Sequence, residues 1–180
     1  HLQHDAIVRY YVFTIEPVLQ RPYLAMEYVD GPSLSEILER DGPLPFEAVR
    51  SLMRRIAAGL QVAHECGIIH RDVSPDNIIL PGGDVSRAKI IDFGSVRVAG
   101  VTEAAPQDES GDILGTVQYT APEYFLGQGG SPRSDMFSLA VICYQMLTGK
   151  LPYGTQIARI RRKADVRRLQ YRPADDDRNV

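Results

Sequence analysis

Three oxygen-bearing side chains near the middle of the chain, Asp72, Asn77 and Asp92, have types and spacing that suit phosphate chemistry. A carboxylate such as that of Asp72 can orient a hydroxyl group and accept its proton. Mg²⁺ binds oxygen ligands, and proteins often hold it with one or two carboxylate or amide groups together with substrate phosphates. Asn77 and Asp92 can supply those two ligands. The three residues therefore suit a metal-assisted transfer of a phosphoryl group to a hydroxyl.

The segment between Asn77 and Asp92 explains how these two side chains could meet. Residues 78–80 and 89–91 are short runs of β-forming residues, and a Pro-Gly-Gly turn signal follows the first run at 81–83. The resulting hairpin would return the chain and bring Asp92 back towards Asn77. An Asp-x-x-x-x-Asn spacing alone is common in loop caps, and Asp-Phe-Gly alone is a turn tripeptide. Neither motif is specific alone, so the prediction rests on their combination and order.

Three short motifs follow one another along the chain: His70-Arg71-Asp72 with Asn77 behind it, Asp92-Phe93-Gly94, and Ala121-Pro122-Glu123. They match, in order, the catalytic loop, the metal-binding motif and the A-P-E motif of protein kinases. The chain resembles a eukaryotic-like (Hanks-type) Ser/Thr protein kinase. Its catalytic-loop sequence, His70 to Asn77, and its basic tail are most similar to those of bacterial members. The resemblance covers about residues 4–153.

The resemblance implies roles for the matching residues. Asp72 would accept the substrate proton, Thr116 would form a hydrogen bond with Asp72, and Ser74 would lie near the γ-phosphate of ATP. Asn77 and Asp92 would bind Mg²⁺. The implied partners are ATP and a protein substrate with a serine or threonine hydroxyl.

Other implied roles concern adenine binding and the support of the catalytic loop. Met26 would be the gatekeeper, Glu27 to Val29 the hinge that holds adenine, and Ile79 a further adenine contact. Arg71 would pair with a phosphorylated activation-segment residue. Asp135 would bond the backbone of the catalytic loop. The set with regulatory or structural roles is His70, Arg71, Phe93, Gly94, Glu123 and Asp135.

The fold class implied by the resemblance is α+β. It is a protein-kinase-like fold, with a mainly helical C-lobe in residues 30–180 and a two-stranded remnant of the N-lobe in residues 1–29. Residues 6–15 and 23–29 are rich in β-branched and aromatic residues and are predicted to be the two strands. Two strands alone make a marginal sheet.

Three helices are predicted in the larger part. One begins near Ser33. A second occupies 46–66, where apolar residues recur at three- and four-residue steps from Phe46 onwards and Gly67 ends the helix. A third occupies 135–147, is apolar on nearly all sides, and has Ser134 placed to cap it and Gly149 to stop it.

Composition indicates one globular unit. The chain has 180 residues and a formal net charge of −3, which gives no sign of nucleic-acid binding. Its longest apolar stretch is too short to cross a bilayer. Cys66 and Cys143 lie in apolar helical contexts and are predicted to be reduced core residues, which favours a cytoplasmic location. The basic run in 159–168 is expected to be a solvated helix face.

Several expected parts of a kinase do not occur between residues 1 and 180. The glycine-rich loop, the strand lysine and its glutamate partner would precede His1, and the arginine partner of Glu123 would follow Val180. We therefore expect an internal fragment that is inactive and poorly soluble alone, with Ile7 and the two strands stripped of their partners.

One matching position departs from the common pattern. Ser74 stands where most Ser/Thr kinases have a lysine that contacts the γ-phosphate as a point charge. Two alternatives to an active protein kinase stay open: a nucleotide-binding pseudokinase that acts as a scaffold, and a small-molecule phosphotransferase. Gly115-Thr116 and the A-P-E motif disfavour the second. Thr102 and Ser110 are candidate phosphorylation sites in the activation segment.

Overall fold

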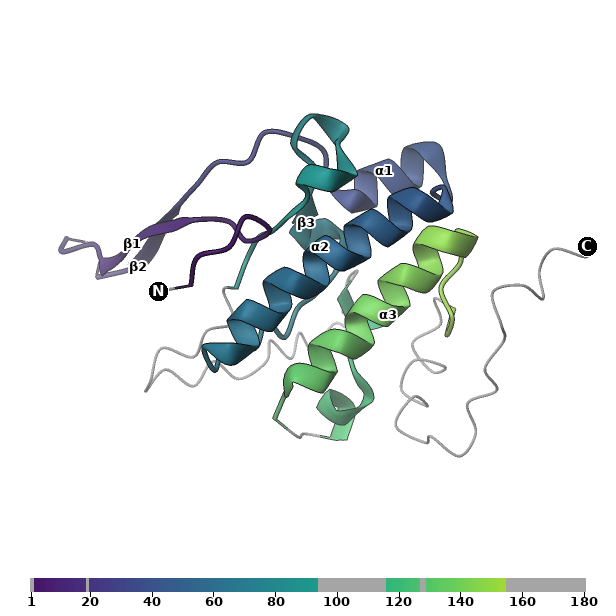
Figure 1. The fold of residues 1–180 in the computed structure, drawn as a ribbon. Coiled ribbons are helices and arrows are strands. Elements are labelled where there is room, and N and C mark those ends of the chain that lie inside the picture. The colour runs from purple at the N-terminus through teal and green to yellow at the C-terminus, as the bar shows by residue number, and fades with distance from the viewer. Residues whose placement is uncertain (1, 19, 94–115, 127–128, 155–180) are drawn as a thin grey trace, which may run out of the picture.

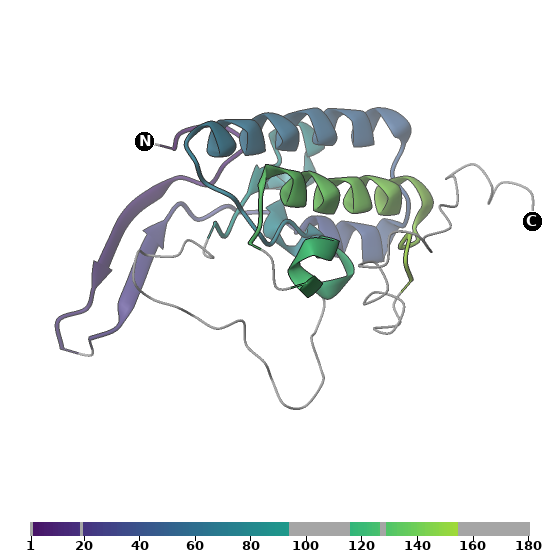
Figure 2. The same cartoon turned by 90° about the horizontal axis from the view of Figure 1, so that it is seen from below.

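The structure is a computed structural model that describes residues 2–18, 20–93, 116–126 and 129–154. Three helices gather on one side of the molecule, and a β-hairpin projects from them (Figures 1 and 2). The helices are α1 (Leu34–Asp41), α2 (Phe46–Glu65) and α3 (Pro132–Thr148); the strands of the projecting hairpin are β1 (Tyr10–Ile15) and β2 (Pro22–Met26); a second, shorter hairpin is made by β3 (Ile78–Ile79) and β4 (Lys89–Ile90).

The core lies between the helices and the short β3–β4 hairpin. Helix α2 contributes a stripe that includes Leu52, Ile56 and Leu60, all fully buried. Helix α3 contributes Leu139 and Ile142, which are also fully buried. Because burial of one such side chain contributes about 1.5–3 kcal/mol, this cluster fixes the helices that carry the loop between α2 and β3.

Helix α1 begins as the sequence predicts. The Ser33 hydroxyl accepts a hydrogen bond from the Glu36 N–H at 3.1 Å, and the Glu36 carboxylate accepts one from the Ser33 N–H at 2.7 Å. This reciprocal pair satisfies two backbone donors that the first turn of a helix would otherwise leave unpaired. Leu34 and Ile37 are buried and form the apolar face of this helix.

The ends of α2 and α3 differ from the predictions. Phe46 is 65% exposed, because it is the first residue of α2 and precedes the turns that meet the core. Cys66 is exposed, since it lies beyond Ala63, the last buried residue of α2; Cys143 is half-buried. Helix α3 begins earlier than predicted, with Ser131 as its N-cap in place of Ser134.

Both long strands are shorter than predicted. β1 begins at Tyr10 rather than at residue 6, and β2 ends at Met26 rather than at residue 29. The segment before β1 is not stripped of partners, as expected, but pairs with β4: the Val8 N–H donates to Ile90 O at 2.9 Å, and the Ile90 N–H donates to Ala6 O at 2.7 Å. Ile7 is therefore only 3% exposed.

The short hairpin is confirmed in the predicted place. β3 and β4 are antiparallel, with Ile78 opposite Ile90 and Ile79 opposite Lys89. The chain between them turns through Gly82 and Gly83, both at positive φ (63° and 76°), where glycine is favoured. The hairpin thus returns the chain to the level of residue 77.

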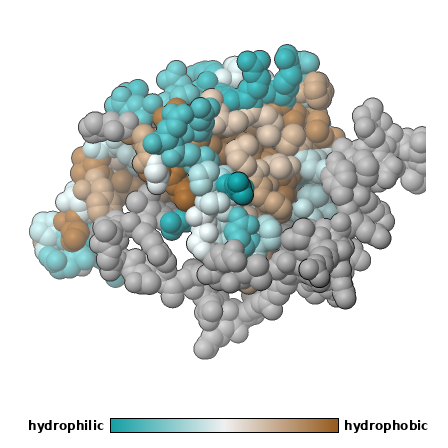
Figure 3. Space-filling view, turned by 60° about the horizontal axis from the view of Figure 1, so that its bottom comes forward, coloured by the Kyte–Doolittle hydropathy of each residue, from teal (hydrophilic) through white to brown (hydrophobic). Residues whose placement is uncertain are grey.

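The projecting hairpin β1–β2 exposes large apolar side chains, and Figure 3 shows hydrophobic atoms at that end of the molecule. These side chains belong to Tyr11, Val12, Phe13, Ile15, Tyr23, Leu24 and Met26. No helix among the described residues is long and apolar enough to span a membrane. Gly94, Thr102, Ser110 and the basic run 159–168 lie outside the described residues.

Candidate active site

The loop that follows α2 is anchored to α3 by one buried carboxylate. Asp135, 1% exposed, accepts the backbone N–H of His70 with Oδ2 and that of Arg71 with Oδ1, both at 2.9 Å. Asp135 lies in the first turn of α3, where the helix dipole favours a negative charge. Such charge-assisted bonds offset the cost of burying a carboxylate and fix the backbone at residues 70 and 71. This is the contact that the kinase resemblance implies for Asp135.

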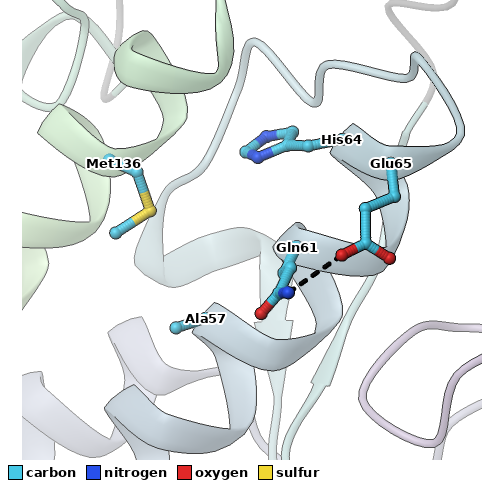
Figure 4. Close-up of a pocket in the computed structure, with 5 residues that line it drawn as sticks. All are labelled: Ala57, Gln61, His64, Glu65 and Met136. Carbon is cyan, nitrogen blue, oxygen red and sulfur yellow. Dashed lines mark hydrogen bonds between the residues drawn. The ribbon is translucent and has the colours of Figure 1, made fainter.

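A third hydrogen bond reaches Asp135 from α2. The Nε2 of His64 lies 2.7 Å from Asp135 Oδ2. His64 also lines a pocket with Ala57, Gln61 and Glu65 of α2, and Met136 projects into it from α3 (Figure 4). His64 thus forms a polar link between the two helices.

The ring of His70 orients the two motifs relative to each other. Its Nδ1 accepts the backbone N–H of Asp72 at 3.2 Å, so its proton is on Nε2, which donates to Ile91 O at 2.9 Å. The ring is fully buried and lies against the ring of Phe93, with 4.6 Å between centroids. His70 therefore ties the loop of Asp72 to the segment that leads from β4 to Asp92.

Asn77 holds the side chain of Asp72. The Asn77 Nδ2 donates to Asp72 O at 2.9 Å and to Asp72 Oδ2 at 3.1 Å. The other carboxylate oxygen of Asp72, Oδ1, is buried and has no hydrogen-bond partner in the part of the chain that the structure describes. An unpaired buried carboxylate oxygen costs stability, which is a common sign of a group kept ready for a substrate.

The surroundings of Asp72 also favour proton transfer. Burial raises the pKa of the Asp72 carboxyl, and the charges of Asp92 and Asp76 add to this effect, against opposing effects from His70 and Asn77. A general base works best when its pKa approaches the working pH. The direction of this shift therefore suits the role that the sequence predicts.

Asp92 returns to the site through the β3–β4 hairpin. The Ile91 N–H donates to Asn77 O at 2.9 Å, so the residue before Asp92 is joined directly to the predicted metal ligand. Asp92 is exposed and has φ of 56°, and Arg71 has φ of 71°. Non-glycine residues in this left-handed region cost energy and cluster at functional sites.

Asn77 and Asp92 fit a Mg²⁺ ion on chemical grounds. Because Asn77 uses its Nδ2 on Asp72, its Oδ1 is directed elsewhere, and no described residue donates a hydrogen bond to that oxygen. Within the described ranges, no three His, Cys, Asp or Glu side chains cluster as a metal site. A cation held by Asn77 and Asp92 would take its remaining ligands from phosphate and water, as Mg²⁺ commonly does.

The two other predicted catalytic residues are Ser74 and Thr116. Ser74 is 1% exposed and begins the short helical turn at Pro75–Asn77, where its carbonyl accepts the Asn77 N–H at 3.1 Å. Its side chain is therefore enclosed by the protein. Thr116 begins a short turn, Thr116–Gln118, but its side chain lies outside the described residues.

Glu123 of the A-P-E motif contacts α3 in this chain. Its Oε1 accepts a hydrogen bond from the Ser134 hydroxyl, which also accepts the Ser131 N–H at 2.9 Å. Glu123 thus supports the first turn of α3 through Ser134, the residue directly before Asp135.

The predicted hinge lies beside β4 through a contact that sequence reasoning missed. The Lys89 Nζ lies 2.6 Å and 2.7 Å from the two carboxylate oxygens of Glu27, and Glu27 Oε2 also accepts the Arg9 N–H at 3.1 Å. Since Lys89 pairs with Ile79, the contact brings the hinge close to the predicted adenine contact. Met26 is 40% exposed. Val29 is half-buried.

Loss of the Lys89 ammonium should weaken the folded state in a pH-dependent way. The hydrogen bond from Lys89 lowers the pKa of Glu27 below its ordinary value of 4.5. The pair therefore stabilises the fold above pH 4.5, and this contribution is lost as pH falls through the lower, folded-state pKa. We expect Lys89→Met to lower the free energy of unfolding at pH 7 by about 0.5 kcal/mol.

Urea unfolding at pH 7 and near pH 3 measures this effect. Arg40→Met is the matched control, because the Arg40–Asp41 pair is strongly exposed (66% and 47%) and should contribute nothing measurable. A Lys89→Met deficit of equal size at both pH values would show that packing of the lysine stem, not the ion pair, is the cause.

Comparison with known proteins decides the family. A profile of the protein kinase domain matches residues 1–178. The chain belongs to the protein kinase family. It is 41% identical over 155 residues to the serine/threonine-protein kinase Pkn1 of Myxococcus xanthus, which covers 85% of this chain. It is 42% identical over 132 residues, 73% of the chain, to the serine/threonine-protein kinase PknA of Mycobacterium tuberculosis.

A solved structure shows the same kinase fold. The structure of Rad53 residues 1–466 in complex with AMP-PNP matches 89% of this chain and 38% of the solved one, with a TM-score of 0.68 and 30% sequence identity. These comparisons confirm the predicted fold class and the predicted likeness to bacterial kinases. The chain spans only 22% of Pkn1 and 29% of PknA.

Proposed function

We propose that the protein containing this chain is a serine/threonine protein kinase that transfers the γ-phosphoryl group of ATP to a protein hydroxyl with the help of Mg²⁺. The observation that carries the proposal is the partly buried Asp72 carboxylate, which Asn77 holds by one oxygen while the other has no partner among the described residues. Relatives named as serine/threonine kinases support the substrate class.

The residues of this chain would divide the work between them. Asp72 Oδ1 would accept the hydrogen bond, and then the proton, of the attacking serine or threonine hydroxyl. Asn77 Oδ1 and the Asp92 carboxylate would hold the metal ion. When bound, Mg²⁺ neutralises charge on the phosphates and helps to align them. Asp135 and His70 would keep these groups in register through the backbone bonds described above.

Adenine would bind at the hinge after β2. The backbone N–H of Glu27 donates to Arg9 O at 2.7 Å and is therefore occupied. The groups that this leaves for adenine are the carbonyl of Glu27 and the backbone of Val29, with Ile79 on β3 as an apolar contact. We propose that residues 1–29 belong to the small lobe and 30–180 to the large lobe, and that the reaction takes place in the cytoplasm, where ATP is supplied.

Labelled ATP tests the proposed reaction. The full-length protein should transfer label from [γ-³²P]ATP to a generic protein substrate, and hydrolysis of the product should release phosphoserine or phosphothreonine. Nucleotide binding with no transfer to any acceptor would instead identify a pseudokinase. Label on small hydroxyl compounds but not on proteins would identify a small-molecule phosphotransferase.

Ser74 provides a test of charge at the phosphate end of the site. If no other cation serves the γ-phosphate, Ser74→Lys should hold or raise kcat in the full-length protein. Because residue 74 is buried, its lysine stem must extend outwards to place the ammonium. Ser74→Met controls for this bulk, and we expect the lysine variant to exceed it in kcat by about tenfold or more, since hydrogen bonds to charged groups contribute about 1.5–3 kcal/mol. Equal, low rates for both variants would point to another residue that supplies the charge.

A further inference from the structure

A tyrosine from the projecting hairpin contacts the backbone next to Asp92. The hydroxyl oxygen of Tyr10, on β1, accepts the backbone N–H of Phe93 at 2.9 Å, although the two residues are 83 positions apart. The Tyr10 ring also meets the Phe93 ring edge-on, with 6.5 Å between centroids and 85° between planes. Phe93 lies in turn against His70. The hairpin is thus joined to the predicted metal-binding motif by one polar and one aromatic contact.

An irregularity in the hairpin sets Tyr10 apart from its neighbours. The pairing of β1 with β2 shifts between Tyr10, opposite Met26, and Val12, opposite Ala25. Such bulges often redirect a side chain next to an active site. Tyr10 is half-buried, whereas Tyr11 and Phe13 are 61% and 54% exposed. The bulge therefore turns one tyrosine of this strand inwards.

The hydrogen bond acts on the peptide group directly after Asp92. The N–H of Phe93 belongs to the peptide that carries the carbonyl of Asp92, so a partner for this N–H fixes the rotation of that peptide. Asp92 holds a left-handed conformation, φ 56°, that a non-glycine residue adopts only when its surroundings impose it. Because the Asp92 side chain is attached to the Cα at the start of this peptide, fixing the peptide restricts the directions that the Asp92 carboxylate can take.

We propose that the hydroxyl group of Tyr10 is a positioning group for Asp92, which holds the Asp92–Phe93 peptide so that the carboxylate faces the Mg²⁺ of the bound nucleotide. This inference rests on the proposed role of Asp92 as a metal ligand. The ring contact with Phe93 alone does not need a hydroxyl. Tyr10 is half-buried, and its hydroxyl accepts the Phe93 N–H, so loss of the hydroxyl would leave this N–H without that partner.

Tyr10→Phe removes the hydroxyl and keeps the ring. In the nucleotide-free full-length protein, amide hydrogen exchange should become faster at Phe93. The Mg²⁺ concentration that gives half-maximal binding of a fluorescent ATP analogue, mant-ATP, should rise. Both effects should be about 2- to 10-fold, the range that corresponds to one neutral hydrogen bond. Tyr11→Phe is the matched control, because it removes an exposed hydroxyl from the same strand and should change neither quantity.

The outcomes separate this inference from the proposed function. If the wild-type protein binds mant-ATP with Mg²⁺ but transfers no phosphate, the kinase proposal fails while the Tyr10 inference is still decided by binding and exchange. Tyr10→Phe curves that overlay the wild-type curves would overturn the inference. A lower Mg²⁺ requirement in Tyr10→Phe would also overturn it, because the hydroxyl would then hold Asp92 away from the metal. Binding that does not depend on Mg²⁺ in the wild type would remove its basis.

Discussion

Replacement of Asp72 by asparagine in the full-length protein is expected to lower kcat by ~10²-fold or more, the range found for loss of a general base. The affinity for ATP should change little, because the role proposed for Asp72 concerns the acceptor hydroxyl rather than the nucleotide. Asparagine can still accept the Asn77 hydrogen bond through its carbonyl oxygen, so the loop should keep its shape. Steady-state kinetics with ATP and a protein substrate separate kcat from KM.

The same substitution should stabilise the fold. A carboxyl whose pKa is raised by folding costs stability above its folded-state pKa, and this cost disappears as pH falls below its ordinary value of 3.8. Asp72→Asn should therefore raise the free energy of unfolding at pH 7 by about 0.5–1 kcal/mol, because solvent screens part of the penalty of this partly buried carboxylate. The gain should vanish below pH 3.8. An inactive and destabilised variant would indicate misfolding rather than loss of a base.

Asp92→Ala should have a different effect, because it removes the proposed metal ligand. We expect the Mg²⁺ concentration for half-maximal rate to rise by about tenfold or more and ATP binding to weaken, since a charged contact contributes about 1.5–3 kcal/mol. The measurement is a Mg²⁺ titration of rate and of nucleotide binding. Asp5→Ala, which removes an exposed carboxylate outside the site, is the control. Titrations of Asp92→Ala that overlay those of the wild type would exclude Asp92 as a ligand.

The hairpin between Asn77 and Asp92 was predictable because its signals are local. Apolar runs and glycines define a turn within fifteen residues, and β3 and β4 pair as those signals indicate. Helix α1 was predictable for the same reason, since Ser33 and Glu36 form a local capping pair. Periodicity failed at the helix ends, where Phe46 and Cys66 continue an apolar pattern past the last turn that has a packing partner.

Contacts between distant segments could not be predicted from the residues alone. Glu27 and Lys89 are 62 positions apart, and nothing local in either segment marks them as a pair. Tyr10 lies in a strand rich in β-branched and aromatic residues, and only the bulge before Val12 directs its side chain towards Phe93. Both contacts depend on where the β1–β2 hairpin lies relative to β4 and the residues that follow β4. That placement is set by the whole fold.

Phosphate transfer by wild-type and Asp72→Asn proteins, assayed side by side with [γ-³²P]ATP, tests the account most directly. The full-length wild type should label serine or threonine of a protein substrate, and the variant should bind mant-ATP with unchanged affinity while its labelling falls by ~10²-fold or more. Near-wild-type labelling by Asp72→Asn would contradict the account, because Asp72 Oδ1 is the one buried carboxylate oxygen without a hydrogen-bond partner among the described residues.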